Sequence, residues 1–162
     1  MALNACELEI DLFCHGLRVP GDVLLDGARP ISRTRAGLGS GLEMVIPTGS
    51  HLKREVWVNV PVAERFAQSS PYRLAGSPEA GHVVIDDRSA ESYAVRLPPE
   101  PVWYAWQTSN DLEMRRVGVL QGTYLAVYVN PVCAFWSADP PLNCHFCTTG
   151  QNVGSSADAA AK

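Results

Sequence analysis

The chain has 162 residues, 46% hydrophobic and 19% charged, so it can bury the core of one globular domain. The formal net charge is −4 and basic residues form no long run, which argues against a broad phosphate-binding face and hence a nucleic-acid partner. No apolar stretch approaches the roughly 18 residues of a membrane-spanning helix, and the N-terminus does not resemble a signal peptide, so we expect no membrane association.

The first predicted element is a helix near the N-terminus, because apolar residues recur there at helical spacings and define one face. These residues are Cys6, Ile10, Phe13 and Leu17. Gly16, with Pro20 soon after it, is typical of a helix end. The alternative is a strand over residues 8–14, in which apolar and acidic residues alternate. We interpret Cys6 and Cys14 as apolar packing residues of this element.

Short strands separated by turn signals follow in the middle of the chain. They are predicted over residues 42–46, 55–60, 82–85 and 93–97. The first two are expected to form a hairpin, and the last two are expected to pair with each other. Residues 63–68 predict one or two helical turns, and Asp86 and Asp87 are interpreted as solvated turn residues.

An aromatic segment over residues 102–106 follows the proline-rich stretch 98–101. Trp103, Tyr104 and Trp106 either line a substrate pocket or form an apolar contact between layers or domains, and we favour the contact. A strand is then predicted over residues 123–129.

That strand leads into a segment holding three of the five cysteines of the chain. Cys144 and Cys147 have two residues between them, so both sulfurs fit on one side of a tight turn, and Cys133 lies upstream with ten residues between it and Cys144. A closed structural zinc site needs four ligands, whereas a cluster with one open iron needs three. An odd number of cysteines, clustered this way, is typical of a reducing compartment, and we expect a cytoplasmic protein.

Residues 144–147, Cys-His-Phe-Cys, resemble the second half of the Cys-x3-Cys-x-aromatic-Cys motif of the radical S-adenosylmethionine (radical SAM) family. In that family the motif follows the first strand of a β/α barrel. Here the strand at 123–129 precedes it and a helix start near residue 155 follows. The chain departs from the motif in its first gap, which has ten residues instead of three. Either the loop is enlarged, or Cys133 is not a ligand.

The resemblance implies a set of cofactors and roles. Cys133, Cys144 and Cys147 are expected to bind three irons of a [4Fe–4S] cluster, and S-adenosylmethionine the fourth, with Phe146 beside the adenine. Reduction by a flavodoxin- or ferredoxin-like donor then cleaves the sulfonium, and the 5′-deoxyadenosyl radical abstracts hydrogen from a small-molecule or peptide substrate.

The predicted fold class is therefore α+β. Residues 1–120 are expected to form a β-rich accessory region. Residues 121–162 are expected to contribute the first strand, the cluster loop and the start of the first helix of an incomplete β/α (TIM-like) radical SAM barrel. Because a complete barrel takes about 250 residues, we expect the chain to be the N-terminal part of a longer enzyme.

Two other interpretations of the cysteines stay open. In one, the three thiolates and a histidine such as His145 form a structural zinc site in a non-enzymatic interaction module. In the other, Cys144 and Cys147 form a thioredoxin-like redox pair at the start of a helix.

Overall fold

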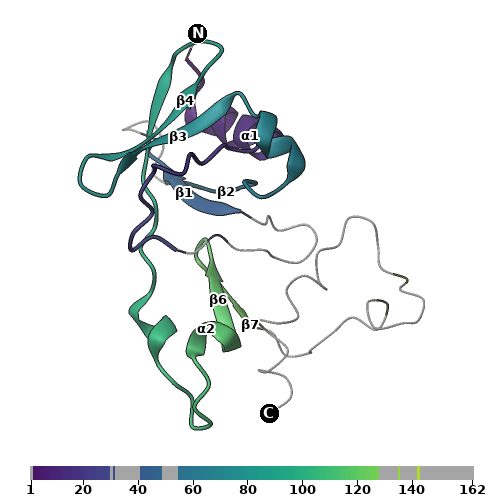
Figure 1. Ribbon diagram of the computed structural model, residues 1–162, viewed down its shortest axis with the longest axis vertical. Helices are drawn as coiled ribbons and strands as arrows, with labels where there is room; N and C mark the ends of the chain where they lie inside the picture. The colour runs from purple at the N-terminus through teal and green to yellow at the C-terminus, as the bar shows by residue number, and fades with distance from the viewer. Residues whose placement is uncertain are drawn as a thin grey trace. The chain divides into compact units, whose positions relative to one another are not determined.

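The structure is a computed structural model that describes residues 2–29, 31, 41–48, 55–127, 135 and 142 (Figure 1). Its described part contains few helices and small antiparallel sheets, which is compatible with the predicted α+β class, and it forms no closed barrel. The chain divides into two compact units, and the described residues up to Glu100 belong to the first and those from Pro101 onward to the second. The predicted assignment of residues 1–120 and 121–162 stays a prediction.

The first unit begins with helix α1 (Ala5–His15), which confirms the helix prediction. Asn4 caps it: its side-chain oxygen accepts from the backbone N–H groups of Cys6 and Glu7, at 3.0 Å each. The Glu7 carboxylate accepts from the Asn4 N–H at 2.9 Å, which completes a capping box. Gly16 ends the helix at a φ of 72°, and its N–H donates to the carbonyl of Leu12.

Antiparallel strands make up most of the rest of this unit. They are β1 (Leu42–Ile46), β2 (Val56–Val60), β3 (Tyr72–Ser77), β4 (Gly81–Asp86) and β5 (Ser92–Val95). β1 pairs with β2, and β4 pairs with β5, as the sequence predicts. β3, which pairs with β4 along its length, was not predicted.

Backbone hydrogen bonds connect the two sheets of the first unit. Val45 in β1 exchanges two of them with Arg96, just after β5, at 2.8 and 2.9 Å. The segment after α1 ties the other strands together: the Leu17 N–H donates to the carbonyl of Pro61, and the Arg18 N–H donates to that of Tyr72. A 3₁₀ helix, η2 (Arg65–Ser69), lies where helical turns were predicted.

The buried face of α1 differs from the predicted one. Leu8 and Leu12 are buried and pack with the strands, whereas Ile10 is 64% and Phe13 53% exposed. Cys6 and Cys14 are also exposed, so their interpretation as packing residues is wrong. Leu8 and Leu12 have helical spacing, as do Ile10 and Phe13, so the sequence pattern does not choose between the two faces. The face that packs against the sheets is the one that is buried.

The core of the first unit joins the helix to both sheets. It contains Leu8, Leu12 and Leu17 with Leu42, Met44, Ile46, Val58, Val60, Tyr72, Leu74, Val84 and Val95.

The second unit is smaller in its described part. It contains η3 (Val102–Ala105), α2 (Met114–Val117), β6 (Gly118–Gln121) and β7 (Tyr124–Val127). β6 and β7 form an antiparallel hairpin that turns at Gly122, whose φ of 59° suits glycine. β7 confirms a strand within the predicted range 123–129, and β6 was not predicted.

Candidate functional site

The predicted ligand residues lie outside the described part of the chain. These are Cys133, Cys144 and Cys147, together with Phe146. Their mutual arrangement therefore stays a prediction. What the structure does describe is the strand that leads toward them, β7, and the residues that position that strand.

Tyr104 holds the β6–β7 hairpin through a specific contact. Its side chain is buried, and its hydroxyl oxygen accepts a hydrogen bond from the Leu120 N–H at 2.8 Å. Trp103 meets the Tyr104 ring edge to face, with the ring centroids 4.6 Å apart. Tyr104, with Trp103 against its ring, thus packs within the second unit and holds the hairpin from which the cysteine segment continues.

Both faces of β7 carry exposed apolar side chains. Tyr124 is 79% and Leu125 is 58% exposed, and successive residues of a strand point to opposite faces. Neither face is therefore covered by other described residues at these positions. Val102 and Trp106 in the same unit are also largely exposed.

The described residues contain no group of three or more His, Cys, Asp or Glu side chains able to hold a metal ion. Cys6 and Cys14 are free thiols on the exposed side of α1. A metal site with three or more such ligands in this chain would therefore need at least one residue beyond the described part, where the other three cysteines lie.

A network of hydrogen-bonded titratable side chains lies in the first unit. At its centre Tyr72, in β3, donates its hydroxyl proton to the Asp11 carboxylate on α1. Arg88 donates to the Tyr72 hydroxyl oxygen at 2.6 Å and to Asp11 at 3.1 Å. Arg88 also donates to both carboxylate oxygens of Asp86, at 2.9 Å each.

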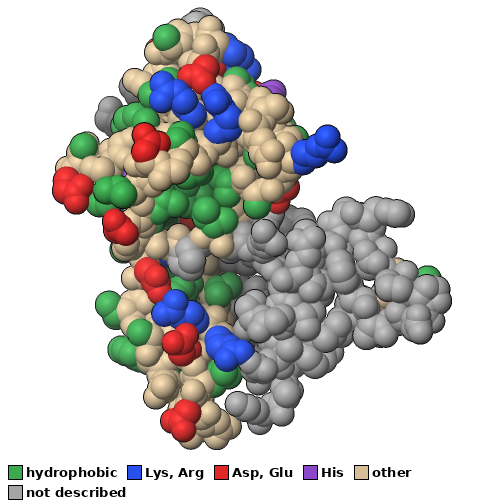
Figure 2. Space-filling model, viewed as in Figure 1, with side chains coloured by type: hydrophobic (Ala, Val, Ile, Leu, Met, Phe, Trp, Pro, Cys, Tyr) green, Lys and Arg blue, Asp and Glu red, His purple; other side chains and the backbone are tan. Residues whose placement is uncertain are grey.

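A second set of ion pairs lies beside the first. Asp87 accepts from Arg18 and, at 2.9 Å, from Arg73. Figure 2 shows basic side chains of the first unit lying next to acidic ones on the visible face. Asp87 is exposed, as predicted, but Asp86 is buried, so its interpretation as a solvated turn residue is wrong.

The contacts within the network move the pKa values of its acidic groups further from pH 7. The Tyr72 hydrogen bond lowers the pKa of Asp11, and Arg88 lowers that of Asp86. Burial, followed by the bond to Asp11, raises the pKa of Tyr72 well above its usual value. The contacts of the network tie α1 to the β3–β4 hairpin.

Sequence reasoning missed this network because its members are far apart in the chain. The Tyr72 hydroxyl and Asp11 are separated by 61 positions, and Arg88 and Asp11 by 77. Only the pairing of β3 with β4 and the packing of α1 bring them together.

No protein-family model, no curated protein and no solved structure matches this chain. Among the described helices, none combines the length and the apolar character needed to cross a bilayer.

Proposed function

We propose that this chain is the N-terminal part of a radical SAM enzyme, in which Cys133, Cys144 and Cys147 bind a [4Fe–4S] cluster. The observation that carries the proposal is the Cys-His-Phe-Cys sequence at 144–147, with a third cysteine upstream and an aromatic residue directly before the last one. Three soft thiolates suit an iron–sulfur cluster that keeps one iron open to another ligand.

Two features of the described chain support this proposal. A strand, β7, lies upstream of the cysteine segment, as the motif's context requires. The exposed apolar residues of β7, Tyr124 and Leu125, suit a strand that is covered by further protein. In this proposal the first unit is an accessory domain.

A cluster held by Cys133, Cys144 and Cys147 would supply the electron for reductive cleavage of S-adenosylmethionine, which is the source of the radical chemistry in this proposal. In this proposal the three thiolates would hold the cluster, and Phe146 would lie against the adenine of the cofactor. The proposal includes an external flavodoxin- or ferredoxin-like electron donor, a small-molecule or peptide substrate, and a cytoplasmic location.

Anaerobic reconstitution of the full chain with iron and sulfide tests the proposal. We expect a brown protein with about four irons and four sulfides per chain, and an electron paramagnetic resonance signal after reduction that changes when S-adenosylmethionine is added. Alanine at Cys144 or Cys147 should abolish the colour, and alanine at Cys133 tests whether the ten-residue gap is compatible with ligation.

Cys6 and Cys14 provide matched controls, because both are free thiols exposed on α1. Cys6→Ala and Cys14→Ala should leave the iron content unchanged. A colourless protein with stoichiometric zinc would refute the cluster and support the zinc module. A reversible Cys144–Cys147 disulfide without bound metal would support the redox pair instead.

A further inference from the structure

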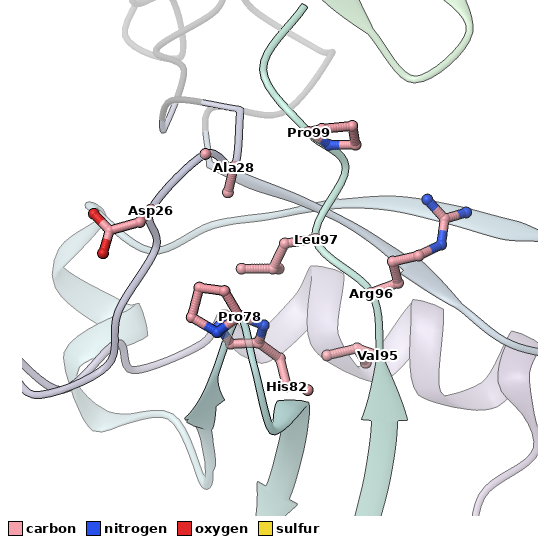
Figure 3. A pocket seen from close by; sticks show the side chains of 10 residues that line it. Asp26, Ala28, Pro78, His82, Val95, Arg96, Leu97 and Pro99 are labelled. Carbon is pink, nitrogen blue, oxygen red and sulfur yellow. The ribbon is translucent and has the colours of Figure 1, made fainter.

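A surface pocket of about 410 Å³ opens in the first unit, between the loop at residues 26–28, the start of β4 and the end of β5 (Figure 3). Apolar side chains make up most of its wall: Ala28, Pro78, Val95, Leu97 and Pro99. Figure 3 shows these side chains turned toward a common space, whereas the side chains of Asp26 and Arg96 turn away from it. The Arg96 guanidinium pairs with Glu55 instead, at 2.9 and 3.0 Å.

The walls of this pocket are tied to each other. The Arg29 N–H donates to the carbonyl of Pro98 at 2.9 Å, and the Glu100 N–H donates to that of Gly27 at 2.7 Å. These bonds hold the loop at 26–28 against the chain that follows β5. A pocket of a few hundred cubic ångströms has the size of a small-molecule site, and these two bonds fix two of its walls relative to each other.

His82 is the polar group of the pocket wall. It is 8% exposed, and its Nε2 lies 2.9 Å from the carbonyl oxygen of Leu24. Because a carbonyl oxygen can only accept, this hydrogen bond requires the tautomer with the proton on Nε2, in which Nδ1 is a hydrogen-bond acceptor. No described residue donates to Nδ1. The pocket wall therefore combines apolar side chains with the Nδ1 acceptor of His82.

We propose that this pocket binds a compact aromatic ring that carries one hydrogen-bond donor, such as an indole or a phenol. The ring packs against Pro78, Val95 and Leu97, and its N–H or O–H donates to Nδ1 of His82. A charged ligand fits less well, because the ionic ends of Asp26 and Arg96 point elsewhere. The proposal does not depend on the iron–sulfur cluster.

Titration of the ¹⁵N-labelled full chain with indole and with 1-methylindole tests this proposal by nuclear magnetic resonance. The two probes have the same ring system, but only indole has a donor. We expect chemical-shift changes at the pocket residues with both probes. Indole should bind about five- to tenfold more tightly than 1-methylindole, which corresponds to the free energy of one hydrogen bond. The ¹⁵N shift of His82 Nδ1 should respond to indole and not to 1-methylindole.

His82→Gln is the informative variant, because the glutamine amide can still donate to Leu24 but offers no acceptor where Nδ1 stood. In this variant the ratio of the affinities for indole and 1-methylindole should fall to about 1, while the affinity for 1-methylindole is retained. N-acetyltryptophan amide is the third probe: tighter binding than indole assigns the site to a protein side chain, and weaker binding assigns it to a free small molecule.

The proposal is overturned if indole shifts no pocket resonance, or if the preference for indole survives His82→Gln. Ala28→Phe provides a second test that does not alter the histidine. Its larger side chain fills the pocket and should abolish binding of both probes, and unchanged binding to a folded Ala28→Phe protein overturns the proposal as well.

Discussion

Replacing Tyr72 by phenylalanine removes one oxygen from the centre of the charged network and keeps the buried ring. The lost hydroxyl donates to Asp11 and accepts from Arg88. A hydrogen bond to a charged group contributes about 1.5–3 kcal/mol. Asp11 and Arg88 are partly exposed and keep their own 3.1 Å contact, so water and this contact replace part of the loss. We therefore expect the free energy of unfolding to fall by about 1–2 kcal/mol at pH 7.

The pH dependence of this loss follows from the lowered pKa of Asp11, whose largest cause is the Tyr72 hydrogen bond. A carboxyl whose folded pKa is depressed stabilises the fold above its unfolded pKa of about 3.9, and this contribution is lost as the pH falls through the folded pKa. The difference between the wild type and Tyr72→Phe should therefore be largest near neutrality and shrink at acidic pH.

Urea titrations at several pH values, followed through methyl resonances of Leu74 and Val84, measure the unfolding of the first unit alone. Tyr93→Phe is the control, because the Tyr93 hydroxyl accepts one neutral hydrogen bond, from the Leu3 N–H at 3.2 Å. Tyr93→Phe should lower the free energy of unfolding by at most about 1 kcal/mol, and this loss should not shrink at acidic pH. A Tyr72→Phe protein as stable as the wild type at pH 7, or one whose loss is equal at pH 3, would refute this reasoning.

The same titration checks three further predictions. Leu12→Ala should lower the free energy of unfolding by about 2–5 kcal/mol, because it leaves a cavity in the core. Ile10→Ala, on the exposed side of α1, should change it by no more than about 0.5 kcal/mol, and equal losses would contradict the observed helix face. Gly41→Ala should cost more than about 2 kcal/mol because its Cβ would meet the backbone of Val60, while Gly21→Ala, with open space around it, should be nearly neutral. Asn4→Ala should cost about 1 kcal/mol by removing the cap of α1, and an unchanged midpoint would contradict that role.

Local patterns in the sequence predicted most of the elements. The ending at Gly16 located the C-terminus of α1, and alternation in 55–60 located β2. Strand β3 was not predicted because only Tyr72 and Leu74 alternate as large buried residues before the small residues Ala75, Gly76 and Ser77. Such a short alternation does not distinguish a strand from a loop until β4 pairs with it.

The candidate cluster ligands were read from residue spacing alone, and their geometry lies outside the described residues. By contrast, the pocket at His82 has no signature in the sequence. Its walls come from residues 26–28, 78–82 and 95–99, and hydrogen bonds between distant backbone groups bring the first and last of these segments together.

The sequence by itself located the end of α1, most of the strands, and the cysteines that stand together, because helix-end signals, periodicity and spacing act over a few residues. Only the tertiary structure decided that Leu8 and Leu12 are buried instead of Ile10 and Phe13, and that Asp86 is buried against Arg88. Both outcomes depend on which surface packs against which, and that choice is made by contacts between residues far apart in the chain.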